Sequence, residues 1–191
     1  WNGGTLPGSG DDVYANGKIV TIDQNVTCLS LRTEAESGNG VVGGGEFQCS
    51  ITATVDVRGG IGIRAGASVA LSFTGAAGAQ LTVLGNVTGG IASDRFGIYH
   101  AGAGNLVVTG DVTGGTGSSA RGIQVVSGNV SITGNVTGGV ASSAFGVFNT
   151  SGTVTITGNV TGAGTGNTHG AYNVSGTATI TGNVTGGTHS G

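Results

Sequence analysis

The most constraining feature of the sequence is a ten-residue segment that recurs at a nearly fixed period. It reads VTITGNVTGA at residues 154–163, and four similar copies begin at Leu81, Leu106, Val130 and Ala178. Between the first glycines of the shared GNVT or GDVT core, the steps are 25, 24, 24 and 24 residues. Self-similarity at such a period indicates a repeat architecture in which each unit packs on its neighbours.

Each repeat unit contains three short apolar runs, rich in β-branched residues and separated by glycine or serine. Such runs are typical of strands, whereas a helix would not persist among so many glycines. Coils stacked in register give parallel strands about 4.8 Å apart, and parallel crossovers are almost always right-handed. The sequence therefore predicts an all-β fold, a right-handed parallel β-helix (β-solenoid) with three-sided coils of about 24 residues.

The repeats divide the chain into three parts. Residues 1–23 form a lead-in or cap, residues 24–80 form irregular coils with insertions, and residues 81–191 form regular coils that we expect to continue beyond residue 191. In the irregular part, VTIDQNVTCLS at 20–30 is similar to VTITGNVTGG, and VDVRGG at 55–60 is similar to GNVTGG. These similarities predict that Asn25 and Asp56 share a column with Asn86.

Alternation along the strands predicts which residues form the core, because successive side chains point to opposite faces of a strand. The expected inward columns are Val83, Val108, Ile132, Ile156 and Ile180; Val87, Val112, Val136, Val160 and Val184; and Ile98, Ile123, Val147 and Ala171. Each residue would contact its own equivalents in the coils before and after it.

An asparagine column is expected at one corner of the coils. Its members are Asn86, Asp111, Asn135, Asn159 and Asn183. Stacked amides can hydrogen-bond to one another and to the corner backbone, which predicts a structural ladder. Apart from Asp111, the same positions are Asn-Val-Thr sequons, so glycosylation is the alternative.

Outward threonines form a possible surface-binding face. They are Thr133, Thr155, Thr157, Thr179 and Thr181. The Thr-x-Thr pattern resembles the flat faces of β-solenoid ice-binding proteins, and the resemblance implies a face that orders surface water. The alternative is that threonine is simply favourable on a solvated strand.

Aromatic residues gather on the third side of the coils. Phe96, Tyr99, Phe145, Phe148 and Tyr172 occur there together with Arg121, Gln124 and His169. Either the rings form an outward strip on which sugars stack, or they stack on one another and stabilise a corner; we favour the second interpretation.

Charge and motifs argue against catalysis, cofactors and nucleic-acid binding. Only 8% of the residues are charged and the net charge is −3, without a basic patch for a phosphate backbone. The regular coils hold two carboxylates, Asp94 and Asp111, whereas glycoside hydrolysis commonly needs a facing pair. His100, His169 and His189 have no metal-ligand spacing, and no apolar run reaches the length of a membrane span.

Cys28 and Cys49 are the only two cysteines and flank an insertion. If they stack in neighbouring rungs they can form a disulfide, and two free thiols are the alternative.

The lead-in WNGGTLPGSGDDV, with the following GKIVTI, resembles the start of many parallel β-helix surface proteins. In combination with the repeated TITGNVTGG, it is similar to phage virion β-helix proteins, such as tail fibres, spikes and capsid fibres, and less closely to bacterial β-solenoid adhesins. The resemblance implies a virion-surface or extracellular protein whose partners are other virion or fibre subunits, in a homo-oligomer or an end-to-end assembly, with a cell-surface glycan as a further candidate partner. We therefore expect a non-catalytic structural or adhesive fibre or spacer. Ice binding, and the binding or degradation of a polysaccharide, are the alternatives.

Overall fold

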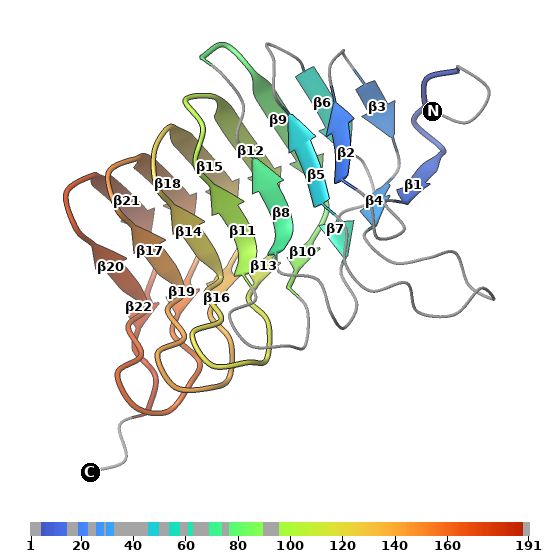
Figure 1. Cartoon of the computed structure of the whole chain (residues 1–191). Coiled ribbons are helices and arrows are strands. Elements are labelled where there is room, and N and C mark those ends of the chain that lie inside the picture. Colours follow the sequence, from blue (N-terminus) through green and yellow to red (C-terminus); the bar gives the residue numbers. More distant parts are fainter. Residues whose placement is uncertain are drawn as a thin grey trace.

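The chain winds into stacked three-sided coils in a computed structural model (Figure 1). The structure describes residues 5–14, 19–22, 26–28, 30–32, 46–49, 54–57, 61–62, 69–73, 77–89 and 96–188. Each regular coil crosses the three sides in the same order, from a five-stranded sheet to a seven-stranded sheet and then to an eight-stranded sheet.

All strand pairings in the described residues are parallel. The eight-stranded sheet contains β1 (Asp12–Tyr14), β4 (Ser30–Arg32), β7 (Ile61–Gly62), β10 (Val87–Thr88), β13 (Val112–Thr113), β16 (Val136–Thr137), β19 (Val160–Thr161) and β22 (Val184–Thr185). The seven-stranded sheet contains β3 (Val26–Cys28), β6 (Thr54–Val57), β9 (Gln80–Leu84), β12 (Asn105–Thr109), β15 (Asn129–Thr133), β18 (Thr153–Thr157) and β21 (Thr177–Thr181). The five-stranded sheet contains β8 (Val69–Phe73), β11 (Phe96–His100), β14 (Ile123–Val125), β17 (Val147–Asn149) and β20 (Ala171–Asn173), and β2 (Ile19–Ile22) pairs with β5 (Glu46–Cys49). The predicted β-solenoid of stacked coils is confirmed.

The core contains the predicted inward columns and a further column that the prediction left out, two residues upstream on the same strands: Leu81, Leu106, Val130 and Val154. Val108, Ile132 and Ile156 are fully or almost fully buried, and they alternate with outward residues along each five-residue strand. Burying each such side chain stabilises the fold by about 1.5–3 kcal/mol. Ile180 and Val184, in the last described coil, are partly exposed because no described residue stacks beyond them.

The register of the irregular coils differs from the predicted one. Val26 pairs with Val55, and Val55 pairs with Leu81, so β3 and β6 belong to the seven-stranded sheet. Asp56 pairs with Thr82, so its predicted alignment with Asn86 is wrong, and Asn25 lies outside the described residues. A Val-x-Val run fits the inward positions of either sheet, and strands of two residues such as β10 carry only one inward side chain to distinguish them.

The lead-in contributes to the solenoid. Residues 12–14 form β1, the first strand of the eight-stranded sheet, and residues 19–22 form β2. The first four residues, including Trp1, lie outside the described residues.

Loops between the eight-stranded and five-stranded sheets project at one corner of the solenoid (Figure 1). In these loops Ser119 and Ser143 have φ angles of 58° and 60°, the only positive φ values outside glycine among the described residues. An L-residue in this left-handed conformation costs about 1–2 kcal/mol.

We expect Ser143→Gly to raise the free energy of unfolding by about 0.5–1 kcal/mol. Glycine relieves the left-handed strain, and this gain exceeds the additional chain entropy that glycine loses on folding. The measurement is chemical denaturation followed by circular dichroism. Ser142→Gly is the matched control, since Ser142 has no positive φ and should only lose stability. Equal effects of the two substitutions would contradict the assignment of strain to Ser143.

Candidate functional site

The outward side of the seven-stranded sheet forms a threonine face, which we define as the outward residues of β9, β12, β15, β18 and β21. These residues form three columns in register: Gln80, Asn105, Asn129, Thr153 and Thr177; Thr82, Val107, Ser131, Thr155 and Thr179; and Leu84, Thr109, Thr133, Thr157 and Thr181. None of these side chains is charged. The threonine face therefore offers hydroxyls, amides and methyl groups in ranks about 4.8 Å apart.

The five threonines singled out in the sequence lie together on this face. Thr133, Thr157 and Thr181 share one column, and Thr155 and Thr179 share the next. Sequence reasoning missed Thr153 and Thr177, which make β18 and β21 carry three outward threonines each. The signal was available, because the period of two continues one step upstream in both segments.

A shallow hollow of about 290 Å³ interrupts the threonine face. It lies beside the column of amides, in which Asn129 Nδ2 donates to Asn105 Oδ1 at 2.9 Å. Val107 and Ser131, which replace threonine in the middle column, line the hollow. Its chemistry suits water or a neutral polar group, because amides and hydroxyls both donate and accept hydrogen bonds.

The asparagine column forms a continuous hydrogen-bonded ladder at the corner between the seven-stranded and eight-stranded sheets. Each Oδ1 accepts the backbone N–H of the equivalent residue in the next coil, at 2.9, 2.8, 3.0 and 2.9 Å from Asn86, Asp111, Asn135 and Asn159 in turn. Asp111 Oδ1 also accepts Nδ2 of Asn135 at 3.3 Å. The side chains thus satisfy corner N–H groups, which explains why these exposed positions carry asparagine or aspartate.

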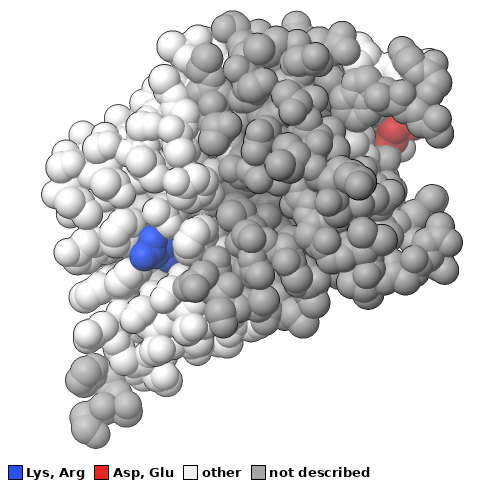
Figure 2. Space-filling view, viewed as in Figure 1, with Lys and Arg blue, Asp and Glu red and all other residues white. Residues whose placement is uncertain are grey.

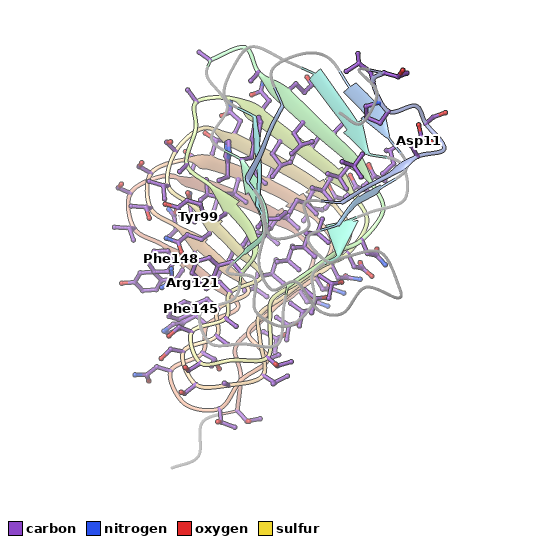
Figure 3. The ribbon with its side chains drawn as sticks, turned by 45° about the vertical axis from the view of Figure 1, so that its right-hand side comes forward. Asp11, Tyr99, Arg121, Phe145 and Phe148 are labelled. Atoms are coloured by element: carbon purple, nitrogen blue, oxygen red, sulfur yellow. The ribbon has the colours of Figure 1, made fainter. Side chains whose placement is uncertain are left out.

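An aromatic stack runs along the outside of the five-stranded sheet (Figure 3). We define it as Phe96, Tyr99, Arg121, Gln124, Phe145, Phe148, His169 and Tyr172. In each coil the two outward residues are three positions apart, because a buried glycine and a buried or partly buried aliphatic residue lie between them, as at Gly146 and Val147. The backbone bends between the two outward residues, so a strict alternation of inward and outward residues does not predict that both rings point outward.

The rings of the aromatic stack cover one another's faces. Phe148 and Tyr172 stack with centroids 5.4 Å apart and planes 12° apart, and Phe145 stacks on His169 at 5.4 Å and 16°. In the coil without a ring, the Arg121 guanidinium lies 4.1 Å from the centroid of Phe148 and also contacts the rings of Phe96 and Phe145. Arg121 Nη1 donates to Gln124 Oε1 at 2.6 Å, which fixes the planar group in place.

This geometry favours a structural role for the aromatic stack over a sugar-binding strip. A sugar stacks on the open face of a ring, whereas the rings of Phe145 and Phe148 have planar groups of neighbouring coils stacked against them. Tyr172, in the last described coil, is 45% exposed. The stack therefore joins successive coils outside the core, as the asparagine ladder does at another corner.

We expect Phe148→Ala to lower the free energy of unfolding by about 2–3 kcal/mol, because it removes two ring contacts and the closest contact of Arg121. Denaturation by urea measures the change, and Thr155→Ala on the threonine face is the control, with an expected effect within about 0.5 kcal/mol. An unchanged stability combined with loss of binding to a neutral polysaccharide would instead support the sugar-binding interpretation.

Charged and metal-ligating groups are sparse in the part of the chain with described side chains. Figure 2 shows one small basic patch and one small acidic patch on the described surface of that view, well apart. Asp111 is committed to the asparagine ladder, and Asp94 and His189 lie outside the described residues. Among the described residues, no three His, Cys, Asp or Glu side chains gather as a metal site.

The two cysteines belong to different sheets. Cys28 ends β3 and pairs in register with Val57, whereas Cys49 ends β5 and pairs with Ile22 of β2. They therefore do not occupy one column of a shared sheet. Their side chains lie outside the described part of the chain, so the disulfide stays a prediction.

No family model matches the chain, and neither a curated protein nor a solved structure matches it. Among the residues that the structure describes, we find no helix with the length and hydropathy of a membrane span.

Proposed function

We propose that the chain is a rigid, non-catalytic rod or spacer in a surface fibre, and that the fibre belongs to a phage virion. The observation that carries this proposal is the unbroken register of the coils from β9 to β21, in which equivalent residues pair through every step. The asparagine ladder and the aromatic stack join the same coils at two further places on the perimeter. A body of this kind resists bending and holds its two ends at a fixed distance, and that distance is set by the number of repeats.

The attachment to a virion rests on the resemblance of the lead-in and repeats to phage virion β-helix proteins. In this proposal the partners are other fibre subunits, in a homo-oligomer or an end-to-end assembly at a virion or extracellular surface. The absence of charged side chains from the threonine face supports a spacer that does not attract ions or nucleic acid along that face.

Electron microscopy of the native assembly from which the chain comes tests this proposal. An antibody raised against the projecting loops, such as 138–145, should label rods on virions, since those loops lie at an outer corner. Label confined to compact, isolated monomers would overturn the proposal.

The threonine face supports a second candidate function, ice binding. The observation in its favour is that β18 and β21 each carry three exposed threonines in register. A thermal hysteresis assay decides the matter: an ice-binding face should lose its effect in Thr155→Lys, whereas a spacer shows no hysteresis before or after the change. Degradation of a polysaccharide is not proposed, because no pair of facing carboxylates lies among the described side chains.

A further inference from the structure

His100 is a titratable side chain inside the core of a solenoid that is otherwise apolar at that level. It ends β11 and its exposed fraction is 0%. Its ring stacks on Phe73 of the preceding coil, with centroids 5.1 Å apart and planes 13° apart. On the other side its partner in register is the buried Val125 of β14.

Both ring nitrogens of His100 face carbonyl oxygens. Nδ1 lies 2.9 Å from the carbonyl oxygen of Phe73, and Nε2 lies 3.1 Å from that of Gly104. A neutral imidazole has a single N–H, so it can donate to only one of these oxygens, whereas an imidazolium can donate to both. The neutral ring therefore leaves one nitrogen lone pair facing an oxygen.

Burial opposes the charged form that would satisfy both carbonyls. Desolvation lowers the pKa of His100 below its ordinary value of 6.5, against the two backbone hydrogen bonds, which raise it. The described residues packed against the ring are Phe73 of β8, Val125 of β14 and the turn glycines Gly104 and Gly128, and none of them carries an acid or a base. No described neighbour thus compensates a charge on the ring.

The same column contains a buried polar side chain that does not titrate. Two coils further on, Asn149 is also fully buried and caps its turn with both ends of the amide. Its Nδ2 donates to the Gly152 carbonyl at 2.9 Å, and its Oδ1 accepts the Gly152 N–H at 3.0 Å. An amide therefore suits this inward corner position, and His100 is the member of the column that can respond to pH.

We propose that His100 makes the β8–β11–β14 level of the solenoid an acid-sensitive joint between the irregular and the regular coils. Above the ordinary pKa of histidine the neutral ring stays stacked in the core. On acidification, a proton either enters the dry core at a cost or binds the ring after this coil has opened. The regular coils beyond it contain no buried titratable side chain among their described residues, so they stay closed.

The sign of the effect follows from linkage. A histidine whose pKa is lowered in the folded state binds a proton more tightly once the coil has opened. The free energy of opening therefore keeps its full value above about pH 6.5 and falls as the pH drops below it, until the folded state itself takes up the proton. The inference is independent of the rod function, because it concerns the isolated chain.

The test compares the wild type with His100→Asn, which copies Asn149, and with His169→Asn, which removes an exposed histidine. Unfolding midpoints in urea are measured at about pH 7.5 and at about pH 5. We expect the wild type and His169→Asn to lose stability at the lower pH and His100→Asn to lose clearly less. An equal loss in His100→Asn, or no loss in the wild type, would overturn the proposal.

A measurement on the unaltered chain keeps the proposal testable if His100→Asn does not fold. In the folded wild type, ¹⁵N NMR of the His100 ring should show a predominantly neutral imidazole at about pH 6.5, where an ordinary histidine is half charged. On further acidification, hydrogen exchange should quicken in residues 96–104 before residues 129–181. If the His100 ring becomes charged above about pH 6.5 while residues 96–104 stay protected from hydrogen exchange, the proposed acid-sensitive joint is refuted.

Discussion

Gly134→Ala is expected to unfold the regular coils or to lower their free energy of unfolding by about 3–5 kcal/mol. Gly134 lies at the corner before the asparagine ladder, with a φ of +150°. A methyl group there would lie 2.6 Å from the carbonyl carbon of Gly110 in the preceding coil and still closer to its oxygen. The obstacle is backbone that is itself held in register, so neither group can move aside cheaply. Urea denaturation followed by circular dichroism measures the loss.

Gly166→Ala is the matched control for this prediction. Gly166 also has a positive φ, of +91°, but the nearest atom to an added methyl group is 3.8 Å away. The substitution should therefore cost only the conformational strain, about 1–2 kcal/mol. Similar losses of stability at Gly134 and Gly166 would show that the close approach of neighbouring coils is not the reason for glycine at the corner.

Removal of one whole repeat, residues 135–158, is expected to leave a folded chain. The deletion joins Gly134 to Asn159, and because Gly134 and Gly158 have the same φ and occupy the same column, every remaining pair stays in register. The shorter chain should keep its β-sheet circular dichroism and unfold at a lower urea concentration, since one interface between coils is lost.

The control is removal of half a repeat, residues 135–146. This deletion joins Gly134 to Val147 and brings a segment of the five-stranded sheet into the place of the eight-stranded sheet. The inward columns and the asparagine ladder are then broken together, so we expect rapid proteolysis and loss of the ordered spectrum. A half-repeat deletion as stable as the whole-repeat deletion would contradict the assigned register.

Most of the core of the regular coils was predictable, because every level repeats the same physical requirement. Ile132 and Ile156 lie in one column, and the alternation around them distinguishes inside from outside without any knowledge of the structure. The asparagine column was predictable for a related reason, since the amide recurs at a single step of the repeat.

Other features depended on geometry that single strands do not encode. The register of β3 and β6 could not be predicted, because a Val-x-Val run fits the inward positions of either sheet. The rings of Phe145 and Phe148 face outward together because a bend at Gly146 interrupts alternation. His100 was considered only as a possible metal ligand, because its contact with the Phe73 carbonyl joins two coils that are not similar in sequence.

The central claim is that the chain is a rod whose length grows by stacking, and small-angle X-ray scattering of a lengthened chain tests it most directly. Three additional copies of residues 135–158 are inserted after Gly158, and the scattering is compared with that of the original chain. We predict a particle about 14 Å longer with an unchanged cross-section, since each coil adds about 4.8 Å. A wider particle of unchanged length, or an expanded chain without a defined cross-section, would contradict the claim.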